Sequence, residues 1–276
     1  MNKKEILKML ERLKEDVPYL KDFKIKKSSC SFYREYDWGR QWINFNDYYH
    51  SIDKQRNALD VEFRPTYGID FNVLDSWLRP IYKKFEAIAG MEAAVYPRAF
   101  LFVKESLLQN DLGSFTFKFL EDGTDFEKDY QYMKTTIAEH ATYIFENYSS
   151  IEAYYHFFVE TYLNNQWCLM KSDAPEIFHM LAAAKIYKPS QYEQIKDRIL
   201  DIWDKSWMKT LDLMSCYDLF VVYREDILAC LESADLSVDA QVISRSETWN
   251  HPSLGDYLKR NLFKGEPRSY YTISTT

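Results

Sequence analysis

Hydrophobic and polar residues alternate in the first part of the chain, which predicts a sheet there. Between 59 and 64, Leu59, Val61 and Phe63 are separated by charged side chains. This period of two is typical of a strand with one face on a core and one in water. Short loops between neighbouring strands favour antiparallel pairing as a meander. The same alternation is found in four further segments: 23–25, 31–38, 41–48 and 114–119, the last of which we expect in the same sheet.

A helical period of three to four residues predicts two helices around these strands. In 3–20, apolar residues from Ile6 to Leu20 form one stripe, and Pro18 weakens the last turn. A second helix is expected from an N-cap at Asp70 to Ala89, with a kink at Pro80. Between 91 and 112 the pattern leaves strand and helix open.

The second half of the chain carries repeated start signals for helices. A Ser or Thr followed three residues later by Glu fits the capping box, in which the two side chains bond to free backbone N–H groups. The signals are Thr124–Glu127, Ser149–Glu152 and Ser190–Glu193, with a related one at Asp173 before Pro175. The expected helices are 125–147, 150–164, 174–186, 191–208 and 216–233, then a short one at 254–262 in an irregular tail.

Together these patterns predict an α+β protein with two domains. Residues 1–122 would form an antiparallel sheet packed by helices. Residues 123–276 would form a helical array docked on it, because short loops between helices favour antiparallel neighbours.

Two short motifs in this sheet region resemble an uncharacterised bacterial family, a domain of unknown function. They are Phe32-Tyr33-Arg34-Glu35 and Ile43-Asn44-Phe45-Asn46, which follow the first helix. The resemblance covers residues 5–85. It implies an α+β domain and carries no established activity or catalytic residues.

Composition excludes several classes of function. The net charge of -7 opposes binding of duplex nucleic acid, which needs a cationic face. Of the seven glycines, no two lie closer than Gly113 and Gly123, so dinucleotide, P-loop and nucleophile-elbow motifs are absent. No apolar run is long enough for a membrane span. The four cysteines are dispersed, which indicates reduced thiols, so we expect a cytoplasmic protein. We expect no cofactor.

The helical half holds one candidate metal or acid–base site. His156 and Glu160 share a helix face, and an antiparallel hairpin at Ser149 would bring His140 to the same level. Two histidines and a glutamate can hold a divalent metal. The alternative is that these histidines are exposed or satisfied within the fold, because no metalloenzyme motif accompanies them.

Aromatic residues make up 17% of the chain, which raises two alternatives. Tyrosines suit binding surfaces because they combine apolar area with a polar group. The candidates for such a surface are Tyr48, Tyr49, His50, Tyr154 and Tyr155. The other alternative is a tyrosine-rich core.

The leading hypothesis is a non-catalytic protein that binds another protein, of the immunity or accessory type. It rests on the absent catalytic motifs, the acidic charge and the tyrosines. The competing hypothesis is a metal- or carboxylate-dependent hydrolase with its site around His140, His156 and Glu160.

Overall fold

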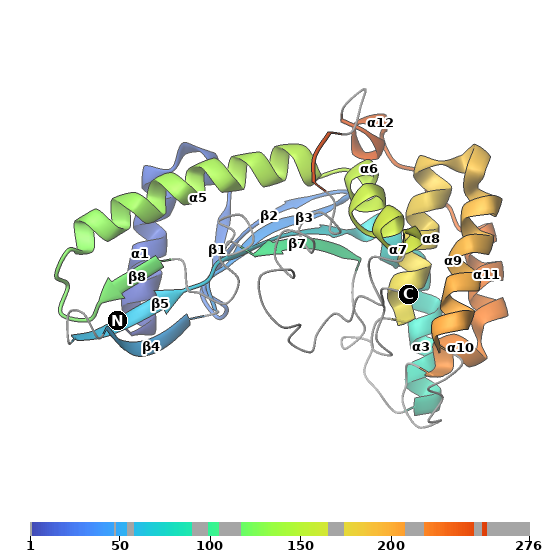
Figure 1. The fold of residues 1–276 in the computed structure, drawn as a ribbon, viewed down its shortest axis with the longest axis horizontal. Helices are drawn as coiled ribbons and strands as arrows, with labels where there is room; N and C mark the ends of the chain where they lie inside the picture. The colour runs from blue at the N-terminus through green and yellow to red at the C-terminus, as the bar shows by residue number, and fades with distance from the viewer. Residues whose placement is uncertain are drawn as a thin grey trace. The chain divides into compact units, whose positions relative to one another are not determined.

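The protein has an α+β fold, as its sequence predicts (Figure 1). A computed structural model describes residues 2–46, 48–53, 58–89, 99–104, 117–164, 174–207, 218–245 and 250–252. The chain folds into two compact units: 1–69 with 101–149, and 70–100 with 150–276. These units differ from the sequence domains 1–122 and 123–276, which stay a prediction.

The first helix, α1 (Lys3–Asp16), begins with a capping box that our sequence analysis missed. Asn2 Oδ1 accepts hydrogen bonds from the N–H groups of Lys4 and Glu5, and Glu5 Oε2 accepts one from Asn2 N. The helix ends before the expected Leu20, because Pro18 disfavours helical backbone at the preceding Val17. A 3-10 turn, η1 (Pro18–Leu20), follows. The apolar stripe of α1 is buried as expected.

The larger sheet has five strands in the order β1-β2-β3-β6-β7. β1, β2 and β3 form the expected antiparallel meander, with Phe32 opposite Ile43 and Tyr36 opposite Gly39. β7 resolves the ambiguous 91–112 in favour of a strand at 100–104; apart from Ala99, the rest of that range lies outside the described residues. The strands are β1 (Lys24–Lys26), β2 (Ser31–Tyr36), β3 (Gly39–Asn44), β6 (Thr66–Phe71) and β7 (Phe100–Lys104).

A second sheet contains β4 (Tyr48–Asp53), β5 (Ala58–Phe63) and β8 (Phe117–Leu120) in that order. The expected continuous meander from 23 to 64 is therefore wrong at β4, where the chain leaves the first sheet. The alternation within 114–119 correctly predicted a strand, but β8 lies in this second sheet and not with β1, β2 and β3. It pairs with β5, and the ring centroids of Phe63 and Phe119 lie 5.9 Å apart in edge contact.

The expected helix from Asp70 to Ala89 is wrong in its first part. Asp70 is buried in strand β6 and is not an N-cap. Three short elements then follow: α2 (Asn72–Asp75), the 3-10 turn η2 (Ser76–Leu78) and α3 (Arg79–Ala89). Pro80 is the second residue of α3 and does not kink it, because a proline in the first turn lacks an N–H that has no helical partner anyway.

The long helix α5 (Phe126–Tyr148) belongs to the first unit, where it packs against β8 and η1 (Figure 1). Its expected bounds of 125–147 were right within one residue. The expected cap at Thr124 is wrong: the N-cap position is Asp125, in left-handed backbone with φ of 59° and no side-chain cap bond. The inner face of α5 is buried and comprises Tyr130, Met133, Ile137, Ala141, Ile144, Phe145 and Tyr148.

The second unit is mainly helical, as expected. Ser150, and not Ser149, caps its first helix, with Oγ accepting from Ala153 N. Tyr223 interrupts the helix expected at 216–233. In the described residues no helix has the length and apolar character needed to cross a bilayer. The elements are α6 (Ile151–Tyr154), the π-helix η4 (Tyr155–Val159), α7 (Glu160–Leu163), α8 (Ala174–Tyr187), η6 (Pro189–Gln191), α9 (Tyr192–Trp207), α10 (Asp218–Val222), α11 (Arg224–Ser233) and α12 (Ala240–Ile243).

The cap expected at Asp173 and the short helix expected at 254–262 lie outside the described residues. The cap expected at Ser190 is replaced by η6, which begins with Pro189 and leads directly into α9.

A close contact between β6 and β3 gives the first testable prediction. Gly68 leaves room for the indole ring of Trp42, which a Cβ at position 68 would overlap. We expect Gly68→Ala to lower the free energy of unfolding by roughly 1–3 kcal/mol, because an overpacked site forces side chains off their rotamers.

Urea denaturation of Gly68→Ala, Trp42→Leu and the double variant tests this contact. The smaller leucine makes room for the new methyl, so the double variant should lose less stability than the two single variants combined. If the loss of stability in the double variant equals the sum of the losses in the two single variants, the overlap between the ring and the new methyl group does not cause the effect of Gly68→Ala.

Candidate functional site

The structure pairs two of the three expected metal ligands. His156 Nδ1 lies 2.8 Å from Glu160 Oε2, at ion-pair distance but without the alignment of a hydrogen bond. His140 lies on α5 in the first unit, whereas His156 lies in the second, and the structure describes each unit by itself. Among the described residues no group of three or more His, Cys, Asp and Glu side chains is placed to hold a metal ion. The three-ligand site stays a prediction.

His156 lies in the π-helix η4, an irregularity that often occurs at functional sites. The N–H of Glu160 bonds to the carbonyl of Tyr155, five residues back. This wider turn changes the angular spacing of side chains relative to an α-helix, so His156 and Glu160 do not have the α-helical geometry that their spacing predicts.

A hydrogen-bonded set, the Glu152 network, surrounds His156. Glu152 is 3% exposed, and its carboxylate accepts bonds from Tyr187 OH at 2.8 Å and Ser244 Oγ at 2.7 Å. Tyr187 OH also lies 3.4 Å from His156 Nε2. The network therefore joins α6, η4, the end of α8 and the residue after α12. Sequence reasoning singled out Glu152 only as a capping residue.

The Glu152 network changes the ionisation of its neighbours. Burial, and then the hydrogen bond to Glu152, raises the pKa of Tyr187 above its usual value, so the hydroxyl stays protonated and donates. Burial lowers the pKa of His251, an effect that the Glu152 carboxylate opposes. Burial therefore favours the neutral forms of both Tyr187 and His251 beside the Glu152 carboxylate.

Tyr154 and Tyr155, expected on a binding surface, are buried. Tyr154 OH donates to Glu176 Oε1 on α8, and His179 Nδ1 lies 3.4 Å from Glu176 Oε2. His179 is fully buried, and its Nε2 has no hydrogen-bond partner among the described residues. The spacing of Glu176 and His179 on one helix face is the signal that sequence reasoning overlooked.

The candidates on β4 lie at a sheet edge. His50 is exposed, and its Nδ1 lies 2.9 Å from Glu121 Oε1. That contact is the main cause that lowers the pKa of Glu121. The ring of Tyr48 contacts those of His50 and Phe63, so it is held within the sheet. The side chain of Tyr49 lies outside the described residues.

A set that sequence reasoning missed lies on α5. Tyr132 and Tyr143 remain 54% and 36% exposed and are among the few large apolar side chains that face solvent in the described residues. Exposed Glu139 and Glu146 follow Tyr132 at spacings of seven and fourteen residues, so all four side chains share one helix face. We call Tyr132, Glu139, Tyr143 and Glu146 the α5 outer face. The signal in the sequence was the apolar stripe of α5, because the side of a helix opposite its buried stripe faces solvent.

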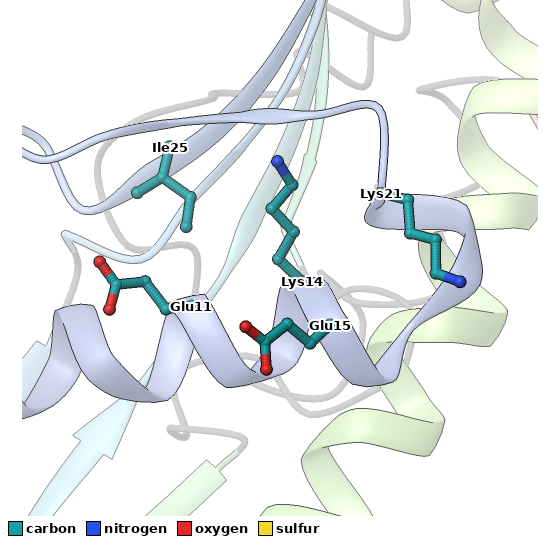
Figure 2. A pocket seen from close by; sticks show the side chains of 5 residues that line it. All are labelled: Glu11, Lys14, Glu15, Lys21 and Ile25. Carbon is teal, nitrogen blue, oxygen red and sulfur yellow. The ribbon is translucent and has the colours of Figure 1, made fainter.

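A groove of about 530 Å³ lies between α1 and the segment leading into β1 (Figure 2). In Figure 2, Glu11, Lys14 and Glu15 project from α1, Lys21 lies on the connection and Ile25 approaches from β1. Four of the five lining residues are charged, while their aliphatic stems and Ile25 supply apolar surface, a combination that suits a peptide.

Comparison with protein-family models, curated proteins and solved structures finds no match to this chain. The resemblance of residues 5–85 to an uncharacterised family therefore stays a prediction.

Tyr155 gives a prediction for alkaline pH. Burial, assisted by the nearby Glu160 carboxylate, raises the pKa of Tyr155 to about 12, against about 10 for an unfolded tyrosine. The folded state therefore keeps a proton that the unfolded state loses. This contribution to stability is complete below pH 10 and is lost as the pH rises toward 12.

We expect the stability of Tyr155→Phe to fall less steeply than that of the natural protein above pH 10. The difference should approach about 1.4 kcal/mol per pH unit, because only the natural protein carries the shifted group. Urea denaturation at several pH values up to 12 measures it, and parallel curves for the two proteins would contradict the assignment.

Proposed function

We propose that this protein binds another protein, without catalysis, through the α5 outer face. The observation that carries the proposal is the pair of exposed tyrosines, Tyr132 and Tyr143, flanked by Glu139 and Glu146 on one helix face. Tyrosines supply large contact area at little cost in side-chain entropy and are enriched in interfaces. The cellular setting that we propose is the cytoplasm of a bacterium, where such a protein would act as an immunity-type or accessory factor.

Charge indicates the kind of partner. The residues of α5 include four carboxylates, at 127, 129, 139 and 146, against two lysines, at 128 and 134. Two of the carboxylates flank the tyrosines on the outer face. An acidic face steers a basic partner into contact and repels acidic proteins. The proposed partner therefore has a basic contact surface.

The rigidity of α5 supports this role. Its inner face is buried along most of the length of the helix. A helix held in this way presents its outer face in a fixed conformation, so little entropy is lost when a partner binds.

Site-specific photocrosslinking in the cells that express this protein tests the proposal. A benzophenone side chain at position 132 should give one discrete adduct with a basic protein. The same side chain at Val222, which is 62% exposed in the second unit, is the matched control. Equal adduct patterns from both positions, or none from position 132, would contradict the proposal.

Charge reversal supplies the second arm of this test. We expect Glu139→Lys with Glu146→Lys to weaken the captured complex by roughly tenfold, because two rim charges become repulsive. Glu225→Lys, at a side chain 87% exposed on α11, should leave binding unchanged. A loss of binding in Glu225→Lys as large as in the α5 variant would assign the effect to net charge alone.

A second candidate function, a metal- or carboxylate-dependent hydrolase, rests on the pair of His156 in the π-helix and Glu160 directly after it. The 2.8 Å separation and the adjoining Tyr187 bring an imidazole, a carboxylate and a hydroxyl into one small region, which is the kind of set that acid–base catalysis uses. The third expected ligand, His140, belongs to the first unit.

Elemental analysis by mass spectrometry, with melting temperatures measured with and without chelator, tests the metal form of this hydrolase. If the protein is such a hydrolase, we expect a stoichiometric metal whose removal lowers the melting temperature, since a ligand that binds only the folded state stabilises it. His156→Ala with Glu160→Gln should then abolish metal binding. No metal and no shift would discard this form.

A further inference from the structure

The free edge of β1 lies beside the groove of Figure 2. β1 is the first strand of the sheet order, so it pairs with β2 on one side and with no other described strand. Lys24 and Lys26 are exposed, and Ile25, which lines the groove, is half-buried between them. An edge strand leaves backbone N–H and C=O groups that can pair with an added strand.

The charges in the groove are incompletely paired. Glu11 lies 3.8 Å from Lys27, at the long limit of an ion pair. The amino groups of Lys14 and Lys21 make no hydrogen bond or ion pair with a described residue, although Lys14 is half-buried. The first 27 residues contain nine Lys or Arg against five Asp or Glu, in a protein whose net charge is -7. The groove lining holds two glutamates and two lysines, and the exposed Lys24 and Lys26 of β1 give its edge a net positive charge on an acidic protein.

We propose that the groove between α1 and β1 binds an extended acidic segment of another protein, which adds to β1 as a further strand. In this mode backbone hydrogen bonds supply affinity, and pockets for alternate side chains supply specificity. Carboxylates two residues apart on this segment share one face of the added strand, so they can face the groove and pair with Lys14 and Lys21, while the side chains between them point to the opposite face.

The same lysines disfavour the competing occupant, a second copy of this chain. Pairing two β1 edges would bring Lys24 and Lys26 of both copies together, and like charges across a strand pair are destabilising. The lysines of β1 therefore disfavour pairing with β1 of a second copy and favour pairing with an acidic strand. This contact shares no residue with the α5 outer face, so either can fail without the other.

Fluorescence anisotropy with short labelled peptides tests the charge preference. A peptide of alternating glutamate and valine should bind saturably at low ionic strength, whereas one of alternating lysine and valine should not. Equal binding of both peptides, or of neither, overturns the proposal. The proposal is also overturned if sedimentation detects a dimer of the protein that the glutamate–valine peptide does not dissociate.

Backbone methylation of the peptide tests strand addition without altering the protein. Alternate N–H groups of a strand point to opposite edges, so only one set can face β1. Methylating either the glutamate or the valine amides should therefore weaken binding by roughly tenfold in one peptide and little in the other. Equal effects of the two methylations would exclude pairing with β1.

Substitutions then locate the site. Lys14→Gln with Lys21→Gln should weaken the binding of the glutamate–valine peptide by roughly fivefold or more, since two ion pairs are lost. Lys8→Gln with Lys83→Gln, at exposed lysines outside the groove, is the matched control. Thermal melting confirms that both variants fold, and equal weakening in both pairs would overturn the assignment to the groove.

Discussion

The hydrogen bond from Gln41 Nε2 to Ser149 Oγ, 2.8 Å long, ties the end of α5 to the first sheet. Both side chains are buried, and Gln41 Oε1 also accepts from Arg34 Nη2 and Tyr36 OH. Removing one partner would leave buried polar groups unsatisfied, which costs more than the bond itself contributes. The bond holds the C-terminal end of α5 against the first sheet, beside the buried inner face that leaves Tyr132 and Tyr143 exposed on the outer side of the helix.

The aromatic excess has its main explanation inside the fold. Tyrosine hydroxyls bond to carboxylates at the edges of both hydrophobic cores, so that each ring is packed while its polar end is satisfied. Burial and the neighbouring carboxylate raise the pKa of each of these tyrosines, which keeps the donor protonated. Four such pairs among the described residues are Tyr130–Asp16, Tyr154–Glu176, Tyr187–Glu152 and Tyr192–Glu232.

Elements with a long, regular period could be predicted from the sequence, and elements defined by partners distant in sequence could not. The stripe of α1 and the alternation of β5 indicated both elements, because a buried face imposes its own period. β6 was missed although Tyr67, Ile69 and Phe71 alternate with smaller or polar residues, because Asp70 indicated the start of a helix. Asp70 has the identity of a helix cap, yet tertiary packing placed it in a strand.

The candidate sites show the same difference between what local patterns predict and what depends on residues distant in sequence. The spacing of His156 and Glu160 correctly put them close together, but no local pattern revealed that Glu152 and Tyr187 complete the set. The groove beside β1 required knowledge of which strand forms the sheet edge, and strand order is a property of the whole chain.

The interleaving of the two units has a consequence for synthesis. The chain passes between them three times, after residues 69, 100 and 149. When the first 69 residues have left the ribosome, β5 still lacks its neighbour β8, and β6 lacks β7. At about 5–20 residues per second, the missing part arrives on the order of ten seconds later. During that interval the nascent chain carries hydrophobic strands with open edges, which can pair with other chains until their neighbours arrive.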